Sequence, residues 1–312
     1  MAVVTVEKAL QLWDEALQTQ VHKTETIAVK AAKGYVLAED IMASTDVPAF
    51  PKSAMDGYAI AYEADRNEYI VDGIIGAGVV WECPVEPGHA VRIMTGAPVP
   101  DTCDTVIMQE QVVGSGEPGT TITMQGKYKC GDHIIPQGEE CRAGTIVIPR
   151  GTEVTSTVQT ILTGLGRTEI TVNAMPRVLV LTSGHEVIEP GESLTPGKIY
   201  NSNRAMICGL LEDLGFHKIT HYHVSDAPEE LESEINHVLQ LSEEADIIIS
   251  SGGVSVGLFD TMPLIYEKLG AQSIYARIQM RPGAASYGAV TPKGQIIFGL
   301  SGNPGAAFNG WH

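Results

Sequence analysis

The sequence has few basic residues, and this shortage excludes one class of function. Its 312 residues include 20 Lys and Arg against 38 Asp and Glu, a formal net charge of -18 at pH 7. Proteins that bind nucleic acid gather lysine and arginine on one surface, and no such cluster occurs here. We therefore expect no nucleic-acid partner. A phosphorylated small molecule would have to be held by backbone N–H groups, a few local cations or a divalent metal.

Cysteine pairs and long apolar runs are also lacking. The five cysteines form no Cys-x-x-Cys pair, so neither a disulfide framework nor a zinc ribbon is indicated. The apolar runs are far shorter than the roughly 18 residues that cross a bilayer, and residues 1–7 do not resemble a signal peptide. These absences predict a cytoplasmic protein with no membrane partner. The apolar fraction of 44% is that of a folded chain.

Common catalytic motifs are absent as well. His185-Glu186 lacks the second histidine of a zinc protease, and the Gly252-Gly253 turn lacks the Gly-Lys-Ser/Thr of a Walker loop. No serine or cysteine lies in a recognisable nucleophile elbow. The remaining chemistry is that of binding and positioning.

The pattern of hydrophobic residues predicts more than one domain, as does the length of the chain. A helix is expected after Thr5. Residues 58–150 contain many short β-rich runs separated by glycine and proline, which is typical of a small barrel or sandwich. Beyond residue 176, strands alternate with helices and predict a parallel sheet. Asn203 and Asn303 are expected to cap two of its helices.

A glycine-rich turn in this second half is the best candidate for phosphate binding. Residues 245–260 read ADIIISSGGVSVGLFD, a buried strand that runs into the turn. Glycines let the backbone approach an anion, and serine hydroxyls donate hydrogen bonds to it. The residues predicted to hold phosphate are Ser250, Ser251, Gly252, Gly253, Ser255 and Gly257.

Three carboxylates, Glu186, Asp226 and Asp260, follow strand ends in the same half. Ligands bind at the carboxyl ends of parallel strands, so these residues are candidates for holding a metal ion or a sugar hydroxyl. The residues around Asp226 favour a structural role for it, as the N-cap of a following helix. Asp56 precedes a glycine, so it fits a residue of a hairpin turn as well as a residue of a functional site. Thr95 alone indicates no particular role.

Taken together, five motifs resemble one family. They are residues 53–59 (SAMDGYA), 92–100 (RIMTGAPVP), 199–204 (IYNSNR), 250–257 (SSGGVSVG) and 300–304 (LSGNP). In this order they resemble the molybdopterin molybdenumtransferases, the MoeA family, which includes the E domain of gephyrin. The resemblance extends from the N-terminus to the end of the chain.

The resemblance implies an α/β plus β, multidomain fold. A three-layer α/β sheet domain of the molybdopterin-binding type would span residues 176–312. A smaller, mostly-β domain of residues 47–135 would be inserted in an N-terminal linker domain made of residues 1–46 and 136–175. The family's C-terminal β domain is missing from the sequence, so a truncated chain is expected.

The resemblance also implies an enzymatic activity. The family inserts molybdenum from molybdate into adenylylated molybdopterin and releases AMP, with a divalent metal that is usually magnesium. The family's catalytic positions match Asp56, Thr95, Glu186, Asp226 and Asp260, of which the last three would hold Mg²⁺. A homodimer is implied, in which Asp56 and Thr95 of one chain complete the site of the other.

Two further segments are implied to bind substrate, and both depart from the family. The residues implied to bind substrate in these segments are Arg281, Pro282, Gly283, Ser301, Asn303 and Pro304. Relatives usually read Lys-Pro-Gly-Lys-Pro where this chain has RPGAA, so Ala284 replaces a lysine, while Arg281 still offers a planar fork of donors to molybdate. In the second segment Ala306 takes the place of a serine.

Two alternatives remain open. The lost lysine and the missing domain are compatible with a degenerate or truncated relative that binds molybdopterin or a partner without turnover. The sheet domain alone is also compatible with a nucleotide pyrophosphatase similar to the CinA proteins. Hydrolysis of dinucleotides without a pterin would identify the pyrophosphatase.

Overall fold

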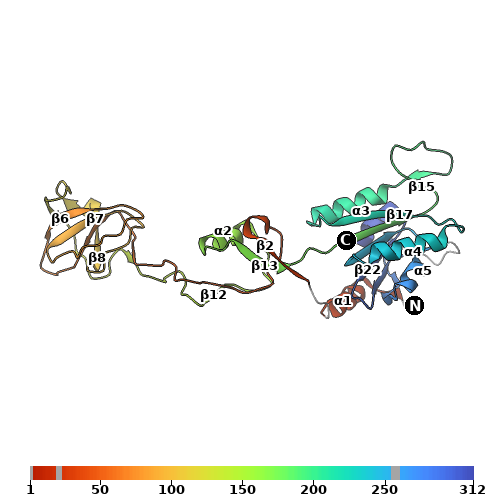
Figure 1. Ribbon diagram of the computed structural model, residues 1–312, viewed down its shortest axis with the longest axis horizontal. Helices are drawn as coiled ribbons and strands as arrows, with labels where there is room; N and C mark the ends of the chain where they lie inside the picture. The colour runs from red at the N-terminus through yellow and green to blue at the C-terminus, as the bar shows by residue number, and fades with distance from the viewer. Residues whose placement is uncertain (1–2, 19–22, 254–260) are drawn as a thin grey trace. The chain divides into compact units, whose positions relative to one another are not determined.

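The computed structural model describes residues 3–18, 23–253 and 261–312 and divides the chain into two compact units (Figure 1). Unit 1 comprises Met1–Glu25 and Asn173–His312, and unit 2 comprises Thr26–Val172. The sequence places residues 1–46 in one domain, whereas the first 25 pack with unit 1. Residues 255, 257 and 260, which the sequence assigns to the site, lie outside the described residues.

A six-stranded sheet forms the centre of unit 1. In spatial order its strands are β17 (Ile219–Val224), β14 (Val178–Ser183), β18 (Ile247–Ser251), β22 (Ile296–Leu300), β21 (Tyr287–Val290) and β19 (Gln272–Tyr275). The first four run parallel and the last two pair antiparallel. All six residues of β14 are buried, as expected for a central strand covered on both faces. The predicted parallel sheet is confirmed, with an antiparallel edge added to it.

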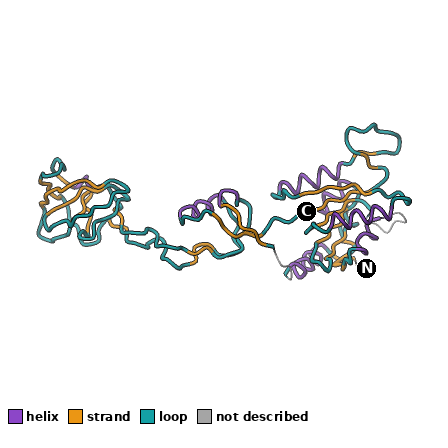
Figure 2. Tube along the Cα trace, in the orientation of Figure 1, coloured by secondary structure: helices purple, strands orange, loops and turns teal. Residues whose placement is uncertain are grey.

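Helices cover both faces of this sheet and give it three layers (Figures 1 and 2). On one face Val178 and Val180 share a buried cluster with α3 (Ser202–Asp213) and α6 (Pro304–Trp311). On the other face Leu179 and Leu181 pack with α4 (Leu231–Ser242) and α5 (Thr261–Lys268). The alternation along β14 follows from the period of two in a strand. The three-layer α/β prediction is therefore confirmed.

Helix α1 (Val6–Leu17) packs onto unit 1 through the aromatic contacts of Trp13. Trp13 is 7% exposed, packs 4.5 Å from the Phe298 ring centroid, and donates from Nε1 to the Tyr275 hydroxyl. Thr5 caps this helix as predicted, with its hydroxyl accepting from the backbone N–H three residues later. Strand β1 (Val3–Val4) also pairs with β20 (Arg277–Ile278).

The start of α3 corrects a sequence expectation. Its N-cap is Asn201, whose side chain accepts from the backbone N–H of Arg204, whereas the sequence predicts Asn203. Asn203 lies inside the first turn instead, which leaves its amide free for tertiary contacts. Asn303 does cap α6 as predicted, with Pro304 at its first position.

Unit 2 is mostly β and has its own buried clusters. Its six-stranded sheet has the order β8 (Thr105–Met108), β5 (Gly57–Ile60), β7 (His89–Ile93), β6 (Glu68–Ile75), β10 (Thr121–Met124) and β9 (Val112–Val113). Short ladders pair β2 (Thr24–Ala28) with β13 (Glu169–Asn173), β3 (Ile41–Met42) with β12 (Ile146–Ile148), and β4 (Lys52–Ser53) with β11 (Ile134–Ile135). Helix α2 (Ser156–Gly164) covers the ladder of residues 24–28 and 169–173. None of the helices described in either unit is long and apolar enough to span a membrane.

Candidate functional site

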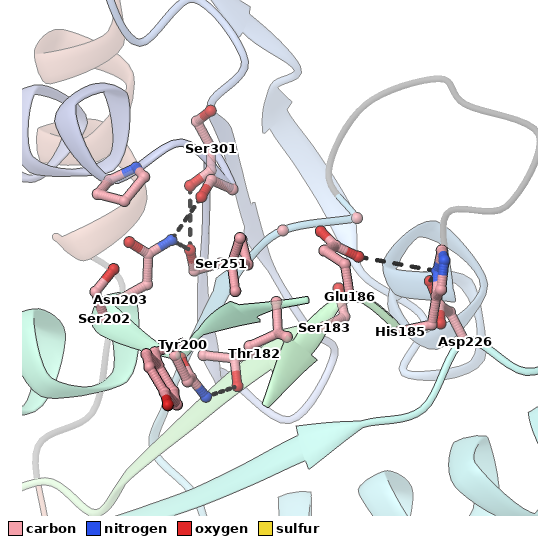
Figure 3. Close-up of a pocket in the computed structure, with 18 of the residues that line it drawn as sticks. Thr182, Ser183, His185, Glu186, Tyr200, Ser202, Asn203, Asp226, Ser251 and Ser301 are labelled. Carbon is pink, nitrogen blue, oxygen red and sulfur yellow. Dashed lines mark hydrogen bonds and ion pairs between the residues drawn. The ribbon is translucent and has the colours of Figure 1, made fainter. Parts of the chain in front are cut away.

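A pocket of about 560 Å³ opens in unit 1 at the carboxyl ends of β14 and β18 (Figure 3). Ligands of open α/β sheets bind at this edge, and the volume suits a nucleotide-sized molecule. Its lining residues fall in the segments 182–187, 199–203, 226–228, 251–253, 285 and 301–304. The segments that follow β14, β17, β18 and β22 therefore meet in one cavity, together with the N-termini of α3 and α6.

Glu186 and Asp226 form the acidic end of the pocket, with His185 between them (Figure 3). The His185 Nδ1 atom is 3.8 Å from Glu186 Oε2 and 3.6 Å from Asp226 Oδ2, longer than a hydrogen bond. Asp226 Oδ1 is buried and has no hydrogen-bond partner among the described residues. A buried carboxylate oxygen without a partner is costly, so this atom is suited to a cation or a donor on a ligand.

Asp226 has no capping role. Helix α4 begins at Leu231, and its N-cap, Glu230, makes no side-chain capping bond. The reading of Asp226 as a helix cap is therefore wrong, because the helix starts one turn later than the sequence indicates. The carboxylate remains directed to the pocket that it lines.

The described residues fit a magnesium ion in the way this ion is usually held. No group of three or more His, Cys, Asp or Glu side chains among residues 3–18, 23–253 and 261–312 forms a ready-made metal cage. Mg²⁺ is typically bound by one or two carboxylates together with water and substrate phosphates. Glu186 and Asp226, with the unpartnered oxygen of Asp226, provide that kind of partial oxygen donor set.

The glycine turn after β18 closes the pocket tightly against β14. Gly252 and Gly253 have φ angles of 87° and 59°, which favour glycine. A Cβ on Gly252 would lie 2.7 Å from the Ser183 carbonyl oxygen, and one on Gly253 would lie 2.8 Å from its hydroxyl. Only glycine fits at these two positions, because both φ angles are positive and Ser183 lies too close for a Cβ. Both residues line the pocket.

The two serines of β18 have different surroundings. Ser251 lines the pocket, donates to the Ser301 carbonyl at 3.1 Å and accepts from Asn203 Nδ2 at 2.7 Å. Asn203 also donates to the Gly302 carbonyl at 2.8 Å, so three loops are tied together at this point. Ser250 is fully buried, and its hydroxyl shares a hydrogen bond with the hydroxyl of Tyr266, away from the pocket lining.

The loop predicted to bind molybdate divides between two cavities. Arg281 and Ala284 line a second pocket of about 480 Å³ together with Arg277, whereas Ala285 lines the main one. Pro282 and Gly283 line neither of these two pockets. The Pro282 carbonyl accepts from Asn309 Nδ2 at 2.6 Å, which fixes the loop against α6.

The segment from 301 to 304 also combines lining and structural roles. Ser301 and Pro304 line the main pocket. The side chain of Asn303 accepts from the backbone N–H of Ala306 at 3.0 Å, so it serves as the cap of α6. The N-terminus of α6 therefore faces the pocket beside that of α3.

Asp56 and Thr95 lie in unit 2 and are bonded to each other. The backbone N–H and the hydroxyl of Thr95 donate to Asp56 Oδ1 at 2.7 and 2.9 Å. The hydrogen bond from the Thr95 backbone N–H is the main cause of the lowered pKa of Asp56. The bond from the Thr95 hydroxyl lowers this pKa further. The carboxylate is thus oriented and kept ionised by its own unit.

The structure contains a polar network beneath the pocket that the sequence did not predict. Asn201 Nδ2 donates to Thr182 Oγ1 and to Glu189 Oε1, both at 3.0 Å. The Thr182 hydroxyl also lies 3.0 Å from His221 Nε2 and 3.1 Å from His223 Nδ1. Burial lowers the pKa of His221 to about 4, so its imidazole is neutral at pH 7. The motif IYNSNR contains Asn201, yet sequence alone gave that motif no chemical role.

Comparison with known proteins identifies the family of this chain. Residues 4–166 match a family model described as the MoeA N-terminal region (domain I and II), and residues 179–312 match one described as a probable molybdopterin binding domain. A molybdopterin molybdenumtransferase of Staphylococcus epidermidis is 39% identical over 300 residues, which are 93% of this chain and 69% of that protein. One of Bacillus subtilis is 36% identical over 311 residues, 96% of this chain and 71% of that protein.

A solved structure shares the fold. The crystal structure of the molybdopterin biosynthesis MoeA protein from Pyrococcus horikoshii matches with a TM-score of 0.80 and 27% identity, and the match covers 98% of this chain and 76% of that one. The five sequence motifs, the two family models and the relatives agree on the family. This chain belongs to the molybdopterin molybdenumtransferases, the MoeA family, which are enzymes of molybdenum cofactor biosynthesis.

Proposed function

We propose that this chain catalyses the magnesium-dependent insertion of molybdenum from molybdate into adenylylated molybdopterin, with release of AMP. The observation that carries the proposal is that one pocket brings together two carboxylates, one of them with an oxygen that has no hydrogen-bond partner among the described residues, and a glycine turn at the end of β18. A protein with a net charge of -18 could hold a pyrophosphate in this way, because a divalent cation bound by its carboxylates would offset their repulsion of the phosphates. The family to which the chain belongs supports the same reaction.

The phosphates are proposed to bind at the end of the pocket formed by Gly252 and Gly253. Backbone N–H groups of such a turn point at an anion, and the absent side chains let it approach. The N-termini of α3 and α6 line the same cavity, and their partial positive charge favours an anion. Ser251 and Asn203 keep these segments in place through their mutual hydrogen bond.

Glu186 and Asp226 are proposed to hold the magnesium ion, together with Asp260 from outside the described residues. When bound, the ion would neutralise the pyrophosphate and polarise the P–O bond that breaks as AMP leaves. The buried oxygen of Asp226 supplies a fixed negative charge for this purpose. Glu186 is 44% exposed and can adjust its position to the incoming substrate.

The remaining predicted residues complete the proposal. In a homodimer, Asp56 and Thr95 of one chain would contribute to the site of the other. Thr95 orients the Asp56 carboxylate and keeps it ionised, so that carboxylate would present a fixed negative charge. Arg281 is proposed to bind molybdate through its planar guanidinium group.

The test is release of AMP from adenylylated molybdopterin. We expect release that requires both molybdate and magnesium, measured by chromatography, and a molybdenum-containing pterin product in equal amount. Release of AMP without molybdate, or from dinucleotides that contain no pterin, would instead indicate a pyrophosphatase. Calorimetric binding of the substrate without any release would indicate a relative that binds the pterin without turnover.

A further inference from the structure

One aromatic side chain in the main pocket has no role in the function proposed above. Tyr200 is the only Phe, Tyr or Trp among the described residues that line this pocket. It is 43% exposed although it lines a cavity. Figure 3 shows it on the side of Ser202 and Asn203, with His185 and Asp226 on the opposite side. The pocket therefore has an aromatic side and an acidic side.

The Tyr200 ring is held at both ends. Its hydroxyl donates to the Glu192 carbonyl at 3.1 Å. Its backbone belongs to β16 (Ile199–Tyr200), which pairs in parallel with β15 (Val187–Ile188), and Tyr200 is in register with Ile188. A side chain that is fixed before binding loses little conformational freedom when a ligand arrives.

The residue that follows adds to this rigidity. Asn201 is 4% exposed, and its side chain bonds Thr182, Glu189 and the backbone of Arg204. Its backbone N–H donates to the Ile188 carbonyl at 2.9 Å. The network beneath the pocket therefore fixes the main chain at the point from which the Tyr200 ring projects.

We infer that Tyr200 is a stacking platform for a flat conjugated ring of the ligand. Aromatic faces carry negative π density, so the face of the Tyr200 ring suits a heterocycle better than a phosphate. The inference rests on the proposed function, because that substrate carries two such rings, a pterin and an adenine. The charged centre of the substrate would then lie toward Glu186 and Asp226, and one of its rings against Tyr200.

Calorimetric titration with three probes tests this inference and separates the two rings. The probes are AMP, ribose 5-phosphate, which lacks the base, and 6-hydroxymethylpterin, which lacks phosphate. Replacing Tyr200 with leucine keeps an apolar side chain but removes the ring. We expect Tyr200→Leu to weaken binding of AMP or of the pterin by about 5- to 150-fold, the range for stacking of one base, and to leave ribose 5-phosphate unchanged.

Two further variants control for structure. Tyr200→Phe retains the ring and removes the bond to Glu192, so it should lose less affinity than Tyr200→Leu. Leu194→Ala lies in the same loop, is 57% exposed, and does not line the pocket, so it should bind all probes as the wild type does. The variants' thermal midpoints report whether the fold is intact.

The outcomes distinguish this inference from the proposed reaction. A selective loss of AMP affinity assigns the platform to adenine, and a selective loss of pterin affinity assigns it to the pterin. Equal affinities of wild type and Tyr200→Leu for both ring probes would overturn the inference, as would a wild type that binds neither. Ring-dependent binding without AMP release would preserve the inference and refute the proposed activity.

Discussion

The carboxylates of the two units differ in their hydrogen-bond partners. In unit 2, Asp56 Oδ1 accepts two hydrogen bonds from Thr95. In unit 1, Glu186 and Asp226 approach only His185, at distances longer than a hydrogen bond, and one oxygen of Asp226 has no partner among the described residues. Asp56 is thus hydrogen-bonded within its own unit, whereas Asp226 keeps one oxygen without a hydrogen-bond partner among the described residues.

This difference indicates different tasks. A carboxylate that accepts two hydrogen bonds is oriented, and it stays ionised because its pKa is lowered. A buried carboxylate oxygen without a partner is destabilising, and such groups persist where a ligand satisfies them. On this basis we propose ligand or metal binding for the unit 1 carboxylates and a fixed negative charge for Asp56.

The largest effect is expected from Asp226→Asn. Without its charge the carboxylate can no longer hold magnesium, so AMP release should fall about 100-fold or more at a fixed magnesium concentration. The thermal midpoint should change little, because the one ion-pair partner of this carboxylate among the described residues is the exposed His185, at 3.6 Å. Asp213→Asn, at an exposed position of α3, is the matched control and should keep full activity. Full activity in Asp226→Asn would contradict the assignment.

A smaller effect is expected from Thr95→Val, which removes the hydroxyl bond and leaves the backbone bond. The pKa of Asp56 should rise toward its usual value, as followed by carboxyl NMR, and AMP release should fall about tenfold. Because the folded pKa is lowered, the stability from these bonds is present above the unfolded pKa and is lost as pH falls through the folded pKa. The variant should weaken that acid dependence. Thr121→Val, at an exposed strand position, should change neither quantity.

The network beneath the unit 1 pocket predicts a pH effect on stability. Burial lowers the pKa of His221 from 6.5 to about 4, with Arg204, Glu189 and His223 as its charged or titratable neighbours. As pH falls, His221 is therefore protonated at a higher pH in the unfolded chain than in the folded one. The folded state loses stability as pH falls from 6.5 to about 4. Hydrogen exchange of the β14 and β17 amides should show this loss. The variant His221→Gln should reduce this dependence of stability on pH, whereas His217→Gln, at an exposed position, should leave it unchanged.

The smallest effect is expected at Ser250. Its hydroxyl is buried against Tyr266, so Ser250→Ala should leave AMP affinity within about twofold and lower the stability of unit 1 by about 1 kcal/mol. Ser251→Ala removes the acceptor of Asn203 at the pocket and should weaken AMP binding more. Equal losses in the two variants would show that Ser250 also contacts the ligand.

Much of the fold follows from local sequence patterns. The buried run of β18, the caps at Thr5 and Asn303 and the short strands of unit 2 all appear where periodicity and turn residues place them. The family resemblance predicted the three layers correctly. The start of α4 was missed because Asp226 and the residues after it imitate a capping sequence that the tertiary structure does not use.

The site was predictable only where a residue type carries its own chemistry. Glu186, Asp226 and the glycines follow strand ends, so their meeting in one pocket follows from the topology of a parallel sheet. The burial of Ser250 depends on which face of β18 meets Tyr266, and the link from Asn201 to Thr182 depends on packing between distant segments. Neither contact has a sequence signal of its own.

The most direct test of the account asks whether one active site draws on two chains. Asp56→Ala and Asp226→Ala are each expected to be inactive in AMP release. If a site combines Asp226 of one chain with Asp56 of its partner, mixing and reassociating the two variants in equal amounts should restore roughly a quarter of wild-type activity, because half of the dimers are mixed and each has one intact site. A mixture that stays inactive while its chains exchange would contradict the shared site.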